Sequence, residues 1–552
     1  MSAGIAERET KMRDRLRVEQ GHWLKLWHDC AAFCMPHKAQ VVRSSHVAQI
    51  TAPQWNPQRS NSVAIDSLNV LSGGCRSWIT PGGAEGWGGI WEPHPYLAKS
   101  KKVKDWLADG TLRSVPVLEA GGFFTGSHEL YSDLGVFGTS GMFLDEGKET
   151  PLACHTKPPS EFVFMRGWEG EVTRVILTYS RTAQQLVDMF GRENVPPRVA
   201  ADIEAQKPDE LHEVIHAIYG RSDDEMKAKY GDDPAGMRFA SCWIHVSERK
   251  VMKESGYPEM PMVIPRWLTW SDSSVYGTSP AMQALADIRG LCLNDMLMAT
   301  LAELQINPRV KTRPGQSGAV DLAPGGVTQE TVEGGVSEWA TQGRWAEGEA
   351  FTGRKEQQVR RTFHADLFEA IAPLIQKREV TNYVAQAVER EAVGRISPAM
   401  GRLASDFINP SARRIFMMLY RAGVFDEAPE EAFYTDAGGQ RYLLYPRAVQ
   451  TNRMSQALNS RKAWAFNNAM TRIAPLAAVK PELLDIYDFE TIARDLDRGD
   501  GMPKEWHLDE DAVEKLREAR EQQRQAAMAQ QVTADLITKQ PKAVAELAGI
   551  AA

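Results

Sequence analysis

The sequence has no long apolar segment and none of the common motifs of nucleotide-driven motors or α/β-hydrolases. No run of about 18 apolar residues occurs among its 552 residues, so neither a membrane-spanning helix nor a membrane partner is expected. A GxxxxGK[ST] phosphate loop and a GxSxG turn are both absent. No GxGxxG pattern follows a strand-like segment, and no cofactor is expected. The N-terminus is charged from residue 7 onward without an apolar signal core, which favours synthesis in the cytosol.

Cysteine is scarce, and its spacing does not suit a disulfide framework or a zinc ribbon. No CxxC pair occurs, and most of the cysteines lie far apart in the sequence. Cys30 and Cys34 are four residues apart on a predicted helix that also carries Trp23 and Trp27. We interpret these two residues as buried thiols on an apolar helix face rather than as metal ligands.

The charge balance argues against a protein that grips DNA tightly. The net charge is −8 and the isoelectric point is about 5.9. Phosphate contacts dominate the affinity of DNA-binding proteins, which are therefore usually basic. If this chain meets DNA, its composition suits passage of the duplex better than tight binding.

The apolar patterns divide the chain into a mixed region between two helical ones, which indicates an α+β fold of several units. Helical spacing predicts helices over residues 5–35 and 61–79, and a glycine-interrupted helical segment over 102–145. Short β-branched or aromatic runs at 161–165, 171–179 and 242–246 predict strands. A helix at 182–190 lies between these runs.

The second half of the sequence is predicted to be mainly helical. Ser279 and Pro280 form a typical helix start, and the apolar spacing continues until Asn307-Pro308. At 1.5 Å per residue this helix is roughly 40 Å long. A glycine- and proline-rich insert follows at 308–350. Further helices are predicted at 355–376 and, interrupted by Pro398 and Pro410, at 383–422; several short ones follow, the last at 509–532.

One motif matches a known metal site. His212, Glu213 and His216 form an HExxH pattern, which on a helix binds zinc through its histidines while the glutamate acts as general base. The surrounding residues are β-branched and aromatic, which favours a strand. On a strand the two histidines are about 13 Å apart, too far to share one ion. A zinc metallohydrolase remains the alternative hypothesis, and a half-buried strand is the preferred interpretation.

Several basic clusters are candidates for contact with phosphate or with a protein partner. Arg309, Lys311 and Arg313 lie in the insert, with Arg344 at its far end. Lys377 and Arg378 follow the second long helix, which carries Arg360 and Arg361. Solvated surface charge is the simpler interpretation of each cluster. Sparse phosphate contacts would be weak, sensitive to salt and blind to base sequence.

The order of these segments resembles the portal, or head-to-tail connector, proteins of short-tailed, podovirus-type bacteriophages. That order is an α+β region, a long helix, a small insert, a second long helix, a short loop, a kinked helix and a helical tail. The resemblance covers residues 5 to 530. The stretches that carry it are 66–83 with Trp87 and Trp91, 131–146, 167–175, 182–191, 266–280, 395–410 and 421–424.

The resemblance implies a structural protein of the virion, made in the host cytoplasm, and not an enzyme. About twelve copies are expected to form a ring at one capsid vertex, through which double-stranded DNA is packaged and ejected. The implied partners are terminase, capsid or scaffold proteins, the tail adaptor and internal core proteins. Lys377 and Arg378 would face DNA, whereas Arg309, Lys311, Arg313 and Arg344 would belong to a docking surface.

The same resemblance implies a division of the chain into named parts of the portal fold. The expected parts are a wing (1–278), a stem helix (279–307), a clip (308–352), a second stem helix (353–376), a tunnel loop (377–382), a kinked wing helix (383–430) and a helical crown (431–552).

Overall fold

A computed structural model describes most of the chain, which divides into two compact units, Met1–Leu458 and Asn459–Ala552. The described residues are 2–43, 61–83, 86–97, 100–147, 149–230, 237–271, 274–314, 320–321, 330, 333–339, 343–369, 394–435, 441–489, 491–493, 496 and 510–539. None of the helices described contains a stretch long and apolar enough to cross a lipid bilayer.

The N-terminal part of the first unit is helical, as predicted. Its helices are α1 (Ser2–Cys34), α2 (Pro36–Arg43), α3 (Val63–Ile79), α4 (Lys101–Ala120) and α5 (Phe123–Phe137). Cys30 and Cys34 are buried in the main core beside Trp27, which confirms their prediction as buried thiols.

The predicted helical segment at 102–145 is wrong at its C-terminal end, where residues 141–145 form strand β2 (Gly141–Asp145). Gly138 ends α5 in the left-handed region, with a φ of 70°. A Cβ atom at this position would overlap the carbonyl group of Gly277, so only glycine permits the close approach of these two segments.

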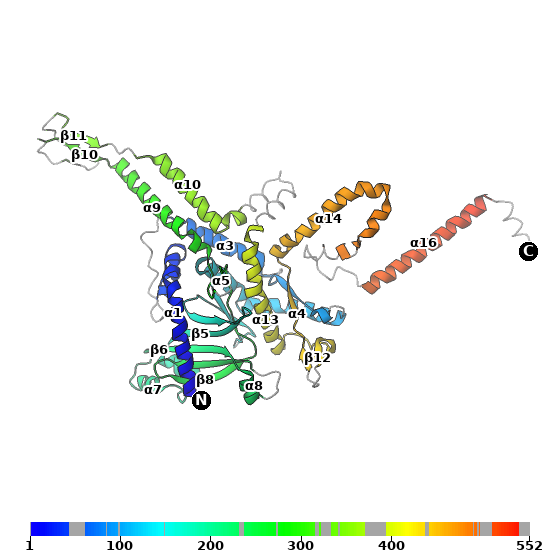
Figure 1. Cartoon of the computed structure of the whole chain (residues 1–552), viewed down its shortest axis with the longest axis horizontal. Helices are drawn as coiled ribbons and strands as arrows, with labels where there is room; N and C mark the ends of the chain where they lie inside the picture. Colours follow the sequence, from blue (N-terminus) through cyan, green and yellow to red (C-terminus); the bar gives the residue numbers. More distant parts are fainter. Residues whose placement is uncertain are drawn as a thin grey trace, which may run out of the picture. The chain divides into compact units, whose positions relative to one another are not determined.

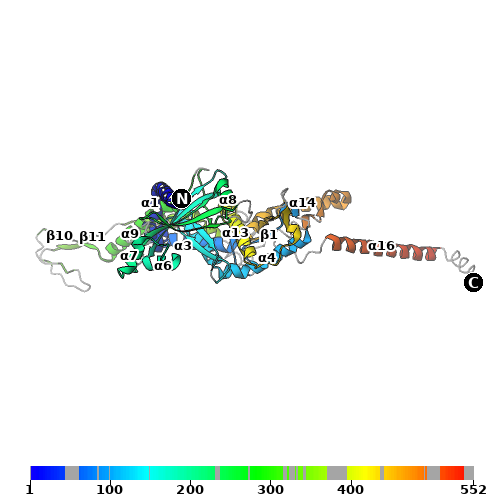
Figure 2. The ribbon, with the colours of Figure 1, turned by 90° about the horizontal axis from the view of Figure 1, so that it is seen from below.

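A five-stranded antiparallel sheet forms the centre of the α+β region. Its strands, in spatial order, are β4 (Phe162–Arg166), β5 (Val172–Thr182), β6 (Leu211–Gly220), β7 (Phe239–His245) and β8 (Lys250–Tyr257). The alternation along β6 sends Ile215 and Ala217 toward the N-terminal half of α1, whereas Val214 packs with residues of α6 (Ala183–Phe190) and α7 (Pro197–Glu204). Figure 2 shows α1 on one side of this sheet and α6 and α7 on the other.

Smaller sheets and short elements complete the first unit. The three-stranded sheet has the order β3 (Ala153–Lys157), β2, β9 (Met262–Val263). The two-stranded pairs are β1 (Gly89–Glu92) with β14 (Arg447–Gln450) and β12 (Phe433–Thr435) with β13 (Arg441–Leu443). The remaining short helices are η2 (Pro95–Leu97), α8 (Asp223–Tyr230) and η4 (Glu430–Ala432).

Two long helices and a hairpin form an arm that projects from the rest of the first unit (Figure 1). Helix α9 (Pro280–Ile306) begins where predicted, because the Ser279 hydroxyl accepts a hydrogen bond from the Met282 N–H group at 3.0 Å. Its buried residues end at Cys292, so the second half lies outside the core. Strand β10 (Arg309–Thr312) pairs with β11 (Val336–Trp339), and α10 (Trp345–Thr362) runs back along α9.

The limits predicted for the second long helix were wrong. α10 begins at Trp345 rather than at 355, and it breaks at Phe363 and His364, where His364 has a φ of 56°. The predicted break at Pro398 is also wrong, because residues 394–403 are continuously helical. The change in the helix occurs before Pro410, as the π-helical turn η3 (Ala404–Ile408), which leads into α13 (Asn409–Arg421).

The C-terminal region contains two helices that are longer than predicted. α14 (Arg453–Val479) has 27 residues, and α16 (Glu510–Lys539) has 30. A short 3-10 helix, η5 (Pro481–Ile486), follows α14. In the part of α16 whose side chains are described, Leu516 and Met528 are exposed apolar residues.

Candidate functional site

The HExxH segment lies on strand β6, as predicted, so its side chains point alternately to the two faces of the sheet. Glu213 lies on the face covered by α1, where its carboxylate accepts a hydrogen bond of 2.7 Å from the Arg13 guanidinium. His212 and His216 point to the opposite face. Glu213, which would act as the base in a metalloprotease, therefore forms an ion pair that links α1 to the sheet.

The contacts of His212 are incompatible with zinc binding by His212 and His216 together. The Glu248 N–H group donates to His245 Nδ1 at 3.3 Å, so the proton of His245 is on Nε2, which lies 3.3 Å from His212 Nδ1. His212 Nε2 is 3.1 Å from an Asp202 carboxylate oxygen, a close electrostatic contact outside hydrogen-bond geometry. In this arrangement His245 donates to His212, and neither ring directs an unshared lone pair toward a common ion.

His216 is held separately from the other two histidines. Its Nε2 lies 2.8 Å from the Ser241 hydroxyl, and its ring stacks on Trp243 with the centroids 4.2 Å apart. Burial lowers the pKa of His216 to about 3. Among the residues that the structure describes, no three His, Cys, Asp or Glu side chains group as a metal site. The zinc metallohydrolase alternative therefore has no support.

The basic residues of the insert share one face of the β10–β11 hairpin. Arg309 and Lys311 are exposed and stand opposite Trp339 and Ser337, and the Arg313 N–H group bonds to the Gly335 carbonyl. Glu338 stands opposite Val310, at an alternate position of the hairpin.

Not all of the predicted basic residues belong to this face of the hairpin. Arg344 is exposed at the start of α10 and pairs with Glu347 at 2.9 Å. Arg360 pairs with Glu369. The predicted DNA-facing residues Lys377 and Arg378 lie outside the described residues.

The projecting half of α9 carries an apolar stripe, which we define as Leu293, Met296 and Leu297. These side chains are 59%, 44% and 59% exposed, and their spacing places them on one face of the helix. Helix α10 covers a different face, where the Asn294 amide donates to the Thr352 hydroxyl at 2.8 Å and Lys355 pairs with Asp287 at 2.6 Å. The stripe is therefore left uncovered by the chain's own second arm helix.

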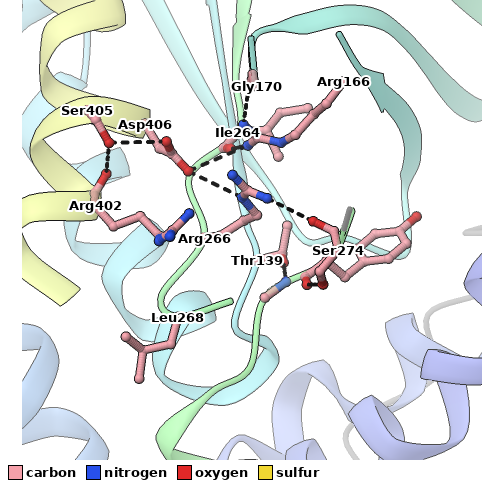
Figure 3. Close-up of polar contacts among 12 residues, drawn as sticks. Thr139, Arg166, Gly170, Ile264, Arg266, Leu268, Ser274, Arg402, Ser405 and Asp406 are labelled. Carbon is pink, nitrogen blue, oxygen red and sulfur yellow. Dashed lines mark hydrogen bonds and ion pairs between the residues drawn. The ribbon is translucent and has the colours of Figure 1, made fainter. Parts of the chain in front are cut away.

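A buried ionic cluster lies beside the segment that leads into α9 (Figure 3). The Asp406 carboxylate accepts a hydrogen bond from Arg266 Nε at 3.3 Å and lies 3.7 Å from Arg166. The three side chains are only 13%, 7% and 10% exposed. Burial and the neighbouring Arg266 charge lower the pKa of Arg166 to about 10, whereas the Asp406 carboxylate acts in the opposite direction.

Sequence reasoning missed this cluster because its members come from three separate segments of the chain. The local signal was Pro410, four residues after Asp406, which indicates a distorted helix at that carboxylate.

A family model described as "Bacteriophage head to tail connecting protein" matches residues 7–507. The chain belongs to this family. The protein is thus a component of the phage particle at the junction of head and tail, which confirms the role that the sequence motifs implied.

Two curated relatives extend over nearly the whole chain. The "Probable portal protein" of Bordetella phage BPP-1 is 23% identical over 535 residues, which cover 93% of this chain and 90% of the relative. The "Portal protein" of Salmonella phage epsilon15 is 24% identical over 537 residues, which cover 95% and 92%. A solved chain from the "Virion of native gene transfer agent (GTA) particle" aligns with 75% of this chain and 86% of its own length at 12% identity, with a TM-score of only 0.32.

Proposed function

We propose that about twelve copies of this chain stand side by side in a ring whose central channel passes double-stranded DNA during packaging and ejection. The proposal treats the chain as a structural channel and a docking hub rather than as a catalyst. Membership of the connector family supports the location at the head-to-tail junction.

The uncovered apolar stripe on α9 is the observation that carries the ring assembly. A helix that leaves the core after Cys292 normally presents polar side chains to water, yet Leu293, Met296 and Leu297 are exposed on this one. Contiguous exposed apolar residues on a projecting element are typical of a protein interface. Burial against the arm of the next copy would remove this surface from water. The same contact would repeat between every two neighbouring copies, as a closed ring requires.

We assign the parts of the proposed ring to the residue ranges that the family resemblance implies. The wing is 1–278, the stem helices are 279–307 and 353–376, the clip is 308–352, the tunnel loop is 377–382, the kinked wing helix is 383–430 and the crown is 431–552. Arg309, Lys311 and Arg313 give the clip a basic face that suits an acidic surface of terminase or of the tail adaptor, with Arg344 beside it. Capsid or scaffold proteins and internal core proteins would contact the wing and crown.

The overall charge suits passage of the duplex without strong binding. Twelve copies with a net charge of −8 carry about −96, and an acidic channel wall repels phosphate and keeps the duplex from adhering. In this proposal Lys377 and Arg378 supply a small number of positive charges at the narrowest part. Such contacts act on the DNA backbone and do not depend on its base sequence.

Mass measurement of the purified chain and of one variant tests the assembly. Leu293→Glu combined with Leu297→Glu places two charges in the proposed contact. We expect the wild type to form particles many times heavier than 61.5 kDa, whereas the variant stays monomeric at the same concentration. Leu112→Glu is a matched control, because Leu112 is exposed on α4 rather than on the arm. Assembly of the double variant at wild-type concentrations would contradict the proposed contact.

A further inference from the structure

The π-helical turn η3 has a local cause in the sequence. Within it the Asn409 N–H group donates to the Ala404 carbonyl, five residues earlier, instead of four. Pro410 has no N–H group, and in a regular helix its ring would collide with the carbonyl of Asp406. Widening the turn avoids this collision. The proline thus determines the position of the π-helical turn and the direction in which the Asp406 side chain points.

The widened turn points Asp406 at two arginines from other segments (Figure 3). Arg166 ends β4 and also donates to the carbonyls of Gly170 and Ile264. Arg266 precedes α9 in the sequence. Asp406 is a common counter-charge for both guanidinium groups, because each contacts its carboxylate. Without it, two buried positive charges would lie close to each other, which is strongly unfavourable.

Arg266 also organises the segment from which α9 starts. Its guanidinium donates to the Ser274 carbonyl at 2.8 Å, and its backbone forms a bridge with Thr139. The Thr139 hydroxyl in turn accepts a hydrogen bond from the Gly277 N–H group at 2.8 Å. Two residues later, Ser279 caps α9 and donates from its hydroxyl to the Val136 carbonyl at 2.7 Å. The root of the arm, which we define as residues 266–271 and 274–279, is therefore tied to the body around Arg266.

We propose that Asp406 is a positioning residue that couples the helical segment 394–421 to the root of the arm. Its carboxylate fixes Arg266, which fixes the segment that starts α9. A displacement of the helix at η3 therefore shifts the start of the arm. The relevance of this coupling to DNA passage rests on the proposed function, because segment 394–421 follows the proposed tunnel loop in the sequence. The coupling itself is a property of the single chain.

Hydrogen exchange on the full-length chain, with every variant compared in the same assembly state, tests the coupling. Asp406→Asn keeps the shape of the side chain and removes its charge. We expect amide exchange in peptides covering 264–282 and 394–408 to accelerate by at least roughly tenfold, while peptides of β6 and β7 stay unchanged. Asp406→Glu, which retains the charge, should restore most of the protection. The control is Asp366→Asn, which breaks the exposed Arg395–Asp366 pair and should leave residues 264–282 protected.

A second variant keeps the test independent of how well Asp406→Asn folds. Pro410→Ala retains every charge but restores a backbone donor, which lets the helix regain α-helical geometry and turns Asp406 away from the arginines. It should accelerate exchange in the same two peptides. Unchanged exchange at 264–282 in both variants, or an equal acceleration in Asp366→Asn, would overturn the proposal. Failure to form rings would count against the proposed function and leave this result unaffected.

Discussion

Glu213→Gln removes one charge from the contact between α1 and the middle strand of the five-stranded sheet. The Arg13–Glu213 pair is 2.7 Å long, and its side chains are 9% and 25% exposed. A second guanidinium, Arg17, lies nearby. Burial lowers the pKa of Arg17, the Arg13 charge lowers it further, and the Glu213 charge opposes both. Loss of the carboxylate therefore removes the contact between Arg13 and the sheet and one counter-charge of Arg17, while Arg13 keeps its contact with the more exposed Asp14.

The expected cost is about 2 kcal/mol, because a hydrogen bond between charged groups contributes about 1.5–3 kcal/mol and the glutamine retains a neutral acceptor. A change of this size raises the population in which α1 is detached by a factor of about 30. Trypsin cleavage after Arg15 and Arg17 measures this population when the opening is fast relative to cleavage. The cleavage rate in Glu213→Gln should rise by the same factor.

A double-mutant cycle with Arg13→Met isolates the pair. The double variant should lose less than the sum of the two single variants, by about 1–2 kcal/mol, because the first substitution already removes the interaction. Glu204→Gln is the control, since it breaks an exposed pair with Arg192 that contributes little. A wild-type cleavage rate in Glu213→Gln would refute the structural role of this residue. The hydrolase hypothesis predicts that result.

Two further predictions concern acid and DNA. Because His216 stays neutral in the folded state while the unfolded state takes up a proton below pH 6.5, stability is full above that pH and falls as the pH drops toward 3. At pH 5 the loss of unfolding free energy is about 2 kcal/mol. His216→Gln should therefore lessen the shift in the urea midpoint between pH 7 and pH 5. An equal shift in the wild type and the variant would contradict this prediction. Lys377→Ala with Arg378→Ala should lower the fraction of phage particles that retain a full genome, relative to Arg360→Ala. Unchanged packaging, retention and ejection would show that these residues do not act on DNA.

The sequence predicts those features of the fold that depend on neighbouring residues. Ser279 and Pro280 mark the start of α9, and the β-branched residues around His216 correctly indicate a strand. Residues 141–145 were misread as helical because they follow a helix, whereas their strand geometry comes from pairing with β3 and β9. The start of α10 at Trp345 was also missed, since the glycine residues nearby obscure the helical pattern.

The ionic cluster at the root of the arm could not be found by the same reasoning. Arg166, Arg266 and Asp406 are each at least 100 residues apart along the chain, and no periodic pattern relates them. Their contact depends on the turn geometry at Asp406, which no helical periodicity reveals. The apolar stripe on α9 could be predicted from the sequence only in part. Met296 and Leu297 are recognisable as part of an apolar helix face, but their exposure becomes apparent only when the position of α10 is known.

Electron microscopy of the purified full-length chain tests the central claim most directly, namely that copies assemble side by side through their arms. The account predicts closed rings with a central channel, in which α9 of one copy contacts the arm of the next through Leu293, Met296 and Leu297. Solitary compact particles under every assembly condition, or rings in which these three side chains face solvent, would contradict it.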